Sequence, residues 1–246
     1  MQAILFDLDG TLLDTLTDIA ESMNIVLKRF GFGEHPVDSY RYFVGDSVRS
    51  MVERSLPADV RDEQTIQKCQ AALSEEYNRR WANNTKPYPG IPELLGELEK
   101  QKIPKAILSN KPHEFTEPMV KKMLPGFSFD KVLGVSESIK RKPDPAAALL
   151  IAKGLRIPAA KFLYLGDTNT DMQTAVAAGM YPVGALWGFR DEKELIESGA
   201  KAIVEKPLDV LKIFNPPSAD HKDGGPFYAA LRRAGKISHK DSGQEL

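Results

Sequence analysis

Four aspartates stand where the sequence predicts that buried strands end. Asp7 and Asp9 follow the first apolar run of the chain, and Asp167 and Asp171 follow a later one. In an extended chain, a spacing of two puts the first pair on one side, with roughly 6.6 Å of rise between them. In a helix that begins near Thr168, a spacing of four puts the second pair on one face of its first turn. Four acids converging on one crevice need a cation, and oxygen ligands without clustered His or Cys favour Mg²⁺ over Zn²⁺.

Two further residues could bind an anion beside these acids. Ser109 follows a predicted strand, where its hydroxyl and nearby backbone N–H groups could hold a phosphate oxygen at a helix entrance. Lys142 could supply a fixed positive charge to a phosphate and to a nucleophilic carboxylate. Structural roles stay open for each: Asp167 as a helix N-cap, Ser109 as a turn residue, Lys142 as part of a solvated basic run. Asp7 and Asp9 fit such a role less well, because two carboxylates that close an apolar strand are costly unless paired or metal-bound.

The elements that must position these residues alternate along the chain. Short apolar runs predict strands at 2–6, 104–108, 131–135, 162–165, 181–186 and 202–204. Helical patterns lie between them at 91–101, 113–123, 145–153, 168–178 and 191–198. This alternation predicts an α/β fold with a Rossmann-like parallel sheet and helices on both faces. Ligands bind such sheets beyond the carboxyl ends of the strands.

The segment 15–85 interrupts the alternation, because its apolar residues recur at helical spacing. We predict a small inserted α-helical domain there, with an α/β core formed by 1–14 and 86–214. The remaining residues, 215–246, are rich in Gly and Pro and indicate a C-terminal tail. The tail is either mobile or docks through its apolar cluster of Phe227, Tyr228 and Leu231 on this subunit or a neighbouring one.

Composition narrows the function classes. The chain of 246 residues has 33 Lys and Arg against 34 Asp and Glu, a net charge of -1, which argues against non-specific nucleic-acid binding. No apolar stretch approaches the roughly 18 residues of a membrane span, and we expect no signal peptide. The one cysteine, Cys69, cannot form an internal disulfide, so we expect a cytoplasmic location. It also lacks a nearby base, so we expect no catalytic thiol. The histidines are scattered, and His113 alone lies near a candidate residue.

Four motifs occur in order: Asp7-Leu8-Asp9-Gly10-Thr11-Leu12, Ser109-Asn110-Lys111-Pro112, Lys142-Pro143-Asp144-Pro145 and Gly166-Asp167-Thr168-Asn169-Thr170-Asp171. Together they resemble the motifs of the haloacid dehalogenase-like hydrolase superfamily, over about residues 1–213. The helical insertion resembles the small α-helical cap of one branch. An aspartate at position 9 is typical of its phosphatases, and Thr11 is more phosphatase-like than mutase-like. The second and third motifs, with Leu186-Trp187-Gly188-Phe189, look most like phosphoglycolate phosphatases and related pyrophosphatases.

The resemblance implies a role for each acid. Asp7 would attack phosphorus and form an aspartyl-phosphate. Asp9 would protonate the leaving alkoxide and later take a proton from water. Mg²⁺ would be held by the Asp7 carboxylate, the Asp9 backbone carbonyl and Asp167, with Asp171 as a secondary or water-mediated partner.

Substrate binding would involve both domains. The resemblance places Ser109 and Lys142 on the phosphoryl oxygens, with Asn110 and Thr11 beside them. The cap loop 44–47 would reach over the leaving group, and Gly45 would allow close backbone approach, although the loop could equally be a plain helix entrance. Arg49 and Arg54 could meet a substrate carboxylate or simply be solvated.

The resulting expectation is a Mg²⁺-dependent phosphatase acting on a small phosphorylated metabolite, first of all 2-phosphoglycolate. Alternatives within the superfamily are a pyrophosphatase, a nucleotidase, or a sugar-phosphate phosphatase or phosphomutase. From another class, a non-catalytic sensor of a phosphorylated ligand is disfavoured by the complete set of site residues. We expect a monomer or homodimer without nucleic-acid or membrane partners.

Overall fold

The computed structural model describes residues 1–214, which contain one large parallel sheet. Its strands lie in the order β5-β4-β1-β6-β7-β8, and every neighbouring pair is parallel. The strand order reverses between β1 and β6, which creates a crevice at their carboxyl ends. The strands are β1 (Ala3–Phe6), β4 (Lys105–Pro112), β5 (Lys131–Val135), β6 (Phe162–Gly166), β7 (Tyr181–Ala185) and β8 (Ala202–Val204).

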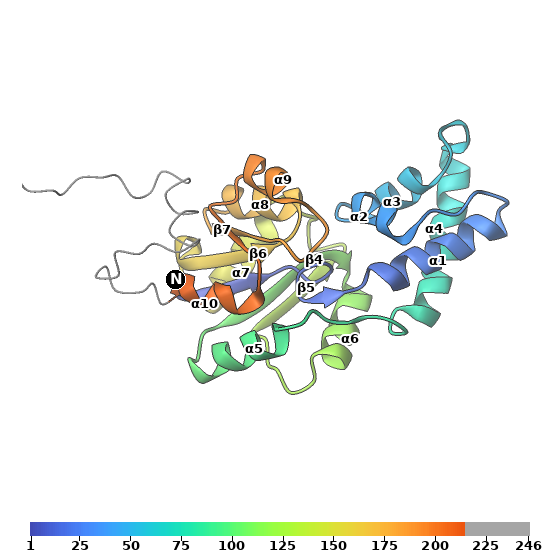
Figure 1. Cartoon of the computed structure of the whole chain (residues 1–246). Helices are drawn as coiled ribbons and strands as arrows, with labels where there is room; N and C mark the ends of the chain where they lie inside the picture. The colour runs from blue at the N-terminus through green and yellow to red at the C-terminus, as the bar shows by residue number, and fades with distance from the viewer. Residues whose placement is uncertain (215–246) are drawn as a thin grey trace, which may run out of the picture.

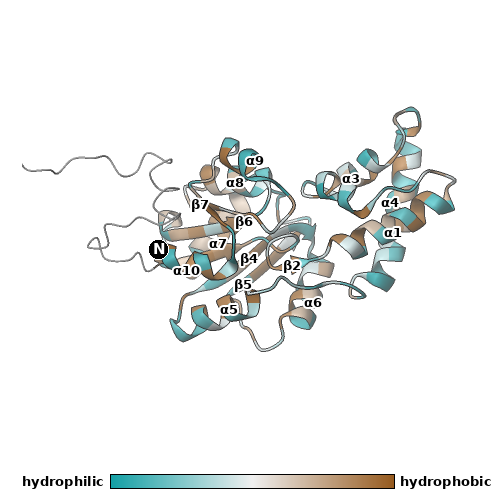
Figure 2. Ribbon diagram, viewed as in Figure 1, coloured by the Kyte–Doolittle hydropathy of each residue, from teal (hydrophilic) through white to brown (hydrophobic). Residues whose placement is uncertain are grey.

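Helices cover both faces of this sheet because its strands alternate their apolar side chains between the two faces. In β1, Ile4 and Phe6 join the core under α5 (Ile91–Lys100) and α6 (His113–Met123). Ala3 and Leu5 face the opposite way, toward α7 (Ala146–Leu155) and α8 (Asn169–Ala177). Figure 2 shows the strands as a largely apolar centre, with polar residues toward the outside of the helices. The short helices α9 (Glu192–Glu197) and α10 (Leu211–Phe214) complete the layers.

A second group of helices lies at one end of the sheet (Figure 1). It contains α1 (Leu16–Arg29), α2 (Tyr40–Phe43), α3 (Val48–Ser55) and α4 (Glu63–Arg80), which pack together around α1 and α4. Two short antiparallel strands, β2 (Leu13–Asp14) and β3 (Lys86–Pro87), join this group to the sheet. The predicted fold class, a parallel α/β sheet with an inserted helical cap, is confirmed.

The connection between cap and core is organised around Asp18, which is completely buried. Its carboxylate accepts hydrogen bonds from the backbone N–H groups of Asn84 and Thr85 and from both of their side chains, at 2.7–3.0 Å. A buried carboxylate is tolerated when its oxygens are satisfied in this way. Asp18 therefore ties the first cap helix to the returning chain.

Several element boundaries differ from the sequence predictions by a few residues, and two of these differences affect the site. Strand β4 continues to Pro112 rather than ending at 108, with a register shift against β5 between Leu108 and Pro112. Helix α8 begins at Asn169, and Thr168 is its N-cap. The domain boundaries predicted near 14 and 86 stay predictions, and the predicted tail 215–246 lies outside the described residues. Within the described part of the chain, no helix is long and apolar enough to cross a membrane.

Candidate active site

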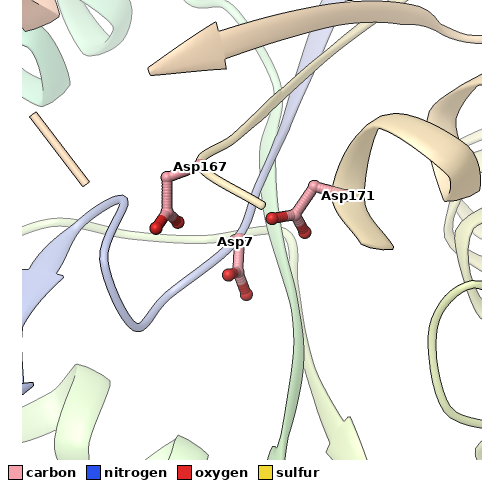
Figure 3. Close-up of side chains that lie close together, drawn as sticks. All are labelled: Asp7, Asp167 and Asp171. Atoms are coloured by element: carbon pink, nitrogen blue, oxygen red, sulfur yellow. The ribbon is translucent and has the colours of Figure 1, made fainter. Parts of the chain in front are cut away.

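Three of the four predicted aspartates meet at the carboxyl ends of β1 and β6. Asp7, Asp167 and Asp171 are buried and offer carboxylate oxygens within 4.8 Å of one another. Figure 3 shows them close together, with Asp7 following β1, Asp167 following β6 and Asp171 on the first turn of α8. The expectation that Asp167 and Asp171 share one helical face is wrong, because the helix begins after Asp167. The two still meet because Thr168 turns the chain into the helix.

Asp167 is held in place by the two loops that flank it. Thr11 Oγ donates a hydrogen bond to Asp167 Oδ1 at 2.6 Å, and the backbone N–H of Phe189 donates to Oδ2 at 2.9 Å. The loops approach so closely that a Cβ added to Gly10 or to Gly188 would lie 2.2 Å from an atom of Asp167. Thr11 is fully buried, contacts Asp167 and does not line the cavity, and its part in substrate binding stays a prediction.

Asp171 has both of its oxygens engaged by the protein. Its Oδ2 accepts from the backbone N–H and the hydroxyl of Thr168, which closes a capping box at the start of α8. Its Oδ1 accepts from Lys142 Nζ at 2.6 Å. Asp171 therefore caps a helix and anchors the lysine, which suits the secondary role that the sequence predicts for it better than that of a main ligand.

Asp7 and Lys142 form the electrostatic centre of the cluster. Lys142 Nζ lies 2.8 Å from Asp7 Oδ1, yet this oxygen has no partner in hydrogen-bond geometry among the described residues. Burial, and next the charge of Asp171, raise the pKa of Asp7 well above its usual value. Burial alone would lower the pKa of Lys142, but Asp171 and Asp7 outweigh it and raise that pKa. The lysine is therefore a fixed cation that Asp7 and Asp171 share.

Burial also raises the pKa of Asp167, to about 7, and the neighbouring charge of Asp171 adds to the effect. Asp7 and Asp167 are thus desolvated carboxylates, and burial together with the charge of Asp171 raises the pKa of both. The single ammonium of Lys142 does not neutralise the cluster. A divalent cation would complete the charge balance, and the all-carboxylate donor set matches the hard ligands that Mg²⁺ prefers. Asp7 and Asp167 would hold such an ion.

Asp9 does not join this cluster, which corrects the expectation that four acids converge. After β1 the chain turns at Gly10, whose φ of +89° suits glycine, and Asp9 lies outside the group of carboxylates that Asp7 joins. Both Asp9 oxygens accept hydrogen bonds from Lys111 Nζ, at 2.9 and 3.0 Å. Lys111 Nζ also lies 4.8 Å from the centre of the Tyr77 ring. Asp9 remains on the cavity wall, on the side that faces the cap.

Lys111 is a site residue that the sequence reasoning missed. It is buried, lines the same cavity and has Asp9 as its counter-ion. The missed signal is the strand period of two, because a strand that continues past 108 places Ser109 and Lys111 on the same side. Ser109 is also buried on the cavity wall, with its Oγ accepting from the Lys111 backbone N–H at 3.2 Å.

Asn110 and Gly45 connect the core to the cap loop. Asn110 Nδ2 donates to the Gly45 carbonyl at 3.1 Å and to the Lys142 carbonyl at 3.2 Å, and its Oδ1 accepts from the Lys142 N–H. Gly45 has a φ of +115° and lines the cavity. Asn110 therefore fixes the cap loop and the lysine backbone at the same time.

A second set of contacts fastens the cap to the loop after β7. Arg190 donates to the carbonyls of Val44, at 2.9 Å, and of Arg41, and Arg41 donates in return to the carbonyl of Gly188 at 2.6 Å. These partners are about 150 residues apart in sequence, so no local pattern predicts them. They hold the cap loop over the acid cluster in the described structure.

The resulting cavity has a volume of about 310 Å³ and lies between cap and core. Its core side carries Asp7, Asp9, Ser109, Lys111 and Lys142. Its cap side is formed by these residues: the mainly apolar Ile19, Val44, Val48, Met51, Leu73 and Tyr77, together with Gly45, Asp46, Ser47, Gln70 and Ser74. The cavity therefore has a charged end for a phosphate and a less polar end for the rest of a ligand.

Several other candidates lie away from the cavity. Arg49 pairs with Glu63 at 2.7 Å, and Arg54 pairs with Asp46, so neither arginine lines the cavity wall. His113 accepts a hydrogen bond from the Gly134 N–H and is likewise absent from the wall. Cys69 is buried in the apolar core as expected for a structural residue.

The profile of the haloacid dehalogenase-like hydrolase family matches residues 4–185, most of the chain. This protein belongs to that family. Phosphoglycolate phosphatase from Pseudomonas fluorescens is 31% identical over 206 residues, covering 82% of this chain and 75% of the relative. The protein of that name from Nitrosospira multiformis is 29% identical over 221 residues, covering 89% and 97% respectively.

Solved structures agree with this assignment. A crystal structure from Lactobacillus delbrueckii subsp. bulgaricus superimposes with a TM-score of 0.81 at 29% identity, covering 86% of this chain and 97% of that one. A haloacid dehalogenase-like hydrolase from Streptococcus pneumoniae gives 0.78 at 25% identity, covering 87% and 98%. The chain is thus a hydrolase of the phosphatase type within this family, similar to its phosphoglycolate phosphatases.

Proposed function

We propose that this protein is a Mg²⁺-dependent phosphatase that cleaves a small phosphate monoester through an aspartyl-phosphate on Asp7. The observation that carries the proposal is the buried Asp7 carboxylate, which lies 2.8 Å from the Lys142 ammonium, has two further buried acids beside it and lines the cavity. One ammonium does not balance three buried carboxylates, so the cluster favours a bound cation.

In the first step, an Asp7 oxygen attacks phosphorus and the bond from phosphorus to the ester oxygen breaks. Lys142 stabilises the charge on the phosphoryl oxygens from the position that Asp171 and Asn110 fix. Ser109 lies on the same wall and donates its hydroxyl to another phosphoryl oxygen. Burial keeps water away from these charges, which strengthens their effect.

Asp9 acts on the leaving group. It lines the same cavity as Asp7, with its partner Lys111 against Tyr77 of the cap, and its carboxyl transfers a proton to the departing alkoxide. In the second step it takes a proton from the water that attacks the aspartyl-phosphate, which releases inorganic phosphate and restores Asp7.

The acid cluster fits a magnesium ion. Asp7 and Asp167 would bind it directly and the Asp9 backbone carbonyl is a third candidate ligand, while Asp171, occupied by Thr168 and Lys142, would orient its neighbours. The bound ion would neutralise charge on the transferring phosphoryl group.

We propose 2-phosphoglycolate as the first substrate to test, because relatives that align over most of this chain carry the name phosphoglycolate phosphatase. Pyrophosphate, nucleoside monophosphates and sugar phosphates are the alternatives. We propose no partner other than the small phosphorylated metabolite, for a monomer or homodimer in the cytoplasm. A non-catalytic sensor is a weaker proposal, since the nucleophile and its lysine are both present.

The test is phosphate release from 2-phosphoglycolate, pyrophosphate, nucleoside monophosphates and sugar phosphates, with Mg²⁺ or with a chelator, for wild type and Asp7→Asn. We expect Mg²⁺-dependent turnover that falls by more than about 10³-fold in Asp7→Asn. Circular dichroism and a thermal melt check that the variant is folded. Near-wild-type turnover by folded Asp7→Asn would remove Asp7 as nucleophile, and silence on all substrates would favour the sensor.

A further inference from the structure

Lys111 is a buried cation on the cavity wall to which the proposed phosphoryl transfer assigns no role. Its ammonium is buried, touches both oxygens of Asp9 and lies over the ring of Tyr77. Both Asp9 oxygens lie within 3.0 Å of Lys111 Nζ, which is the geometry of an ammonium paired with a carboxylate. An ammonium has three N–H donors, and Asp9 occupies two of them.

Tyr77 supplies an independent observation at the same place. It lines the cavity, is 8% exposed, and its hydroxyl has no hydrogen-bond partner within residues 1–214. Its ring is fixed edge-on against Phe115, with ring centres 5.3 Å apart. Burial raises the pKa of Tyr77 to about 12, so the hydroxyl keeps its proton and can donate. A buried donor without an acceptor beside a buried cation points to an absent anion.

Lys111 is the cation of the cavity wall that is available to the leaving group of a substrate. Lys142 belongs to the phosphoryl end, and among the described residues Lys111 is the other cation that lines the cavity. The arginines of α3, Arg49 and Arg54, are paired with Glu63 and Asp46 instead. Apolar side chains such as Val48 and Met51 line part of the cap side, and its polar lining residues carry no positive charge: Asp46, Ser47, Gln70 and Ser74.

We propose that Lys111 and Tyr77 form a second anion subsite, which selects phosphate compounds whose leaving group carries another negative charge close to the scissile bond. The inference rests on the proposed phosphatase function and narrows its substrate class. The subsite lies next to Asp9, the group assigned to the leaving oxygen, so an anion bonded near that oxygen reaches it. A carboxylate, as in 2-phosphoglycolate, and the second phosphoryl group of pyrophosphate share this chemistry, whereas neutral alcohols do not.

The experiment compares kcat/KM for 2-phosphoglycolate, pyrophosphate and 2-hydroxyethyl phosphate in the full chain with Mg²⁺. The last is a phosphate ester of nearly the same size as 2-phosphoglycolate whose leaving alcohol is uncharged. In wild type, at least one of the two substrates with an anionic leaving group should be preferred over 2-hydroxyethyl phosphate, and which one identifies the source of the anion. In Lys111→Met we expect this preference to fall by about 10- to 100-fold, the range for hydrogen bonds to charged groups. In Tyr77→Phe, which keeps the ring, we expect a fall of about 3- to 10-fold.

Lys105→Met is the matched control. Lys105 is a buried lysine of the same strand that pairs with Glu99 at 3.0 Å and lies over the ring of Phe129, but it is not on the cavity wall. Its variant should keep the wild-type preference. The subsite is refuted if folded Lys111→Met and Tyr77→Phe lose activity equally on substrates with charged and with uncharged leaving groups, or if wild type does not prefer a charged leaving group. The proposed phosphatase function would stand in either case. Absence of turnover on every ester would instead reject the proposed function and the subsite with it.

Discussion

Asp18 at the hinge and Asp7 at the acid cluster are both buried carboxylates, but their surroundings are opposite. Asp18 accepts five hydrogen bonds from Asn84 and Thr85. Asp7 has a single cation nearby, two acids as neighbours, and an oxygen without a hydrogen-bond partner in the described part of the chain. At the hinge, the folded protein satisfies both oxygens of Asp18 with hydrogen bonds, whereas the acid cluster lacks positive charge. The contrast separates a carboxylate that supports the fold from one that is ready for a ligand.

The largest difference should appear in the stability of Asp18→Asn and Asp7→Asn. Asp18→Asn replaces an acceptor by a donor facing donors, so we expect the free energy of unfolding to fall by about 2–4 kcal/mol. Asp7→Asn removes a desolvated charge repelled by Asp171, so its free energy of unfolding should rise at neutral pH. Urea denaturation at pH 7.5 without Mg²⁺ measures both. Equal destabilisation by the two substitutions would abolish the distinction.

Gly188→Ala tests whether the cluster depends on the close packing of its flanking loop. The new Cβ would lie 2.2 Å from Asp167 Cβ, so the carboxylate must move. We expect Mg²⁺ affinity to weaken by about 10- to 100-fold, as for the loss of a ligand-orienting contact. Calorimetric Mg²⁺ titration provides the measurement, with Gly154→Ala as control because nothing lies within 4 Å of its Cβ position. Unchanged Mg²⁺ affinity in Gly188→Ala would mean that Asp167 is not a ligand.

The raised pKa of Asp167 predicts how pH changes the stability of the metal-free protein and its affinity for Mg²⁺. Because its pKa is about 7 in the folded protein and about 3.9 in the unfolded chain, the folded state binds the proton more tightly. The metal-free protein should therefore lose stability as pH rises from about 4 through 7. Mg²⁺ must displace this proton, so its apparent affinity should be about tenfold weaker at pH 6 than at pH 8. Thermal melts with and without Mg²⁺ across this range measure both trends, and a pH-independent Mg²⁺ affinity would contradict the assignment.

Arg190→Gln should have the smallest effect, because it touches neither cluster nor hinge. It removes the charged donor that holds the Val44 and Arg41 carbonyls. We expect KM to rise by a few-fold with little change in the free energy of unfolding, since these bonds matter when the cap closes over substrate. Lys193→Gln, an exposed change on helix α9 just after Arg190, is the control. A fall in kcat of more than tenfold with KM unchanged would show that Arg190 acts on the chemical step instead.

The sequence predicts the strand ends and the Asp7–Asp167–Asp171 cluster because short apolar runs followed by acids are a local pattern. It failed at Asp9, where the extended-chain geometry stops applying as soon as the chain turns at Gly10. It missed Lys111 because the predicted strand ended at 108, which removed the alternation that would have paired it with Ser109. No local pattern predicts the contacts of Arg190 or of the Phe189 N–H, since their partners come from distant parts of the chain.

The contacts that close the cap over the core share one property. Asn110, Arg190 and Arg41 all bind backbone carbonyls across the interface, those of Gly45, Val44 and Gly188 among them. A carbonyl persists whatever side chain its residue carries. The cap can therefore exchange the side chains that meet a leaving group while the closing contacts survive, which makes substrate range separable from catalysis and leaves room for one to evolve without dismantling the other.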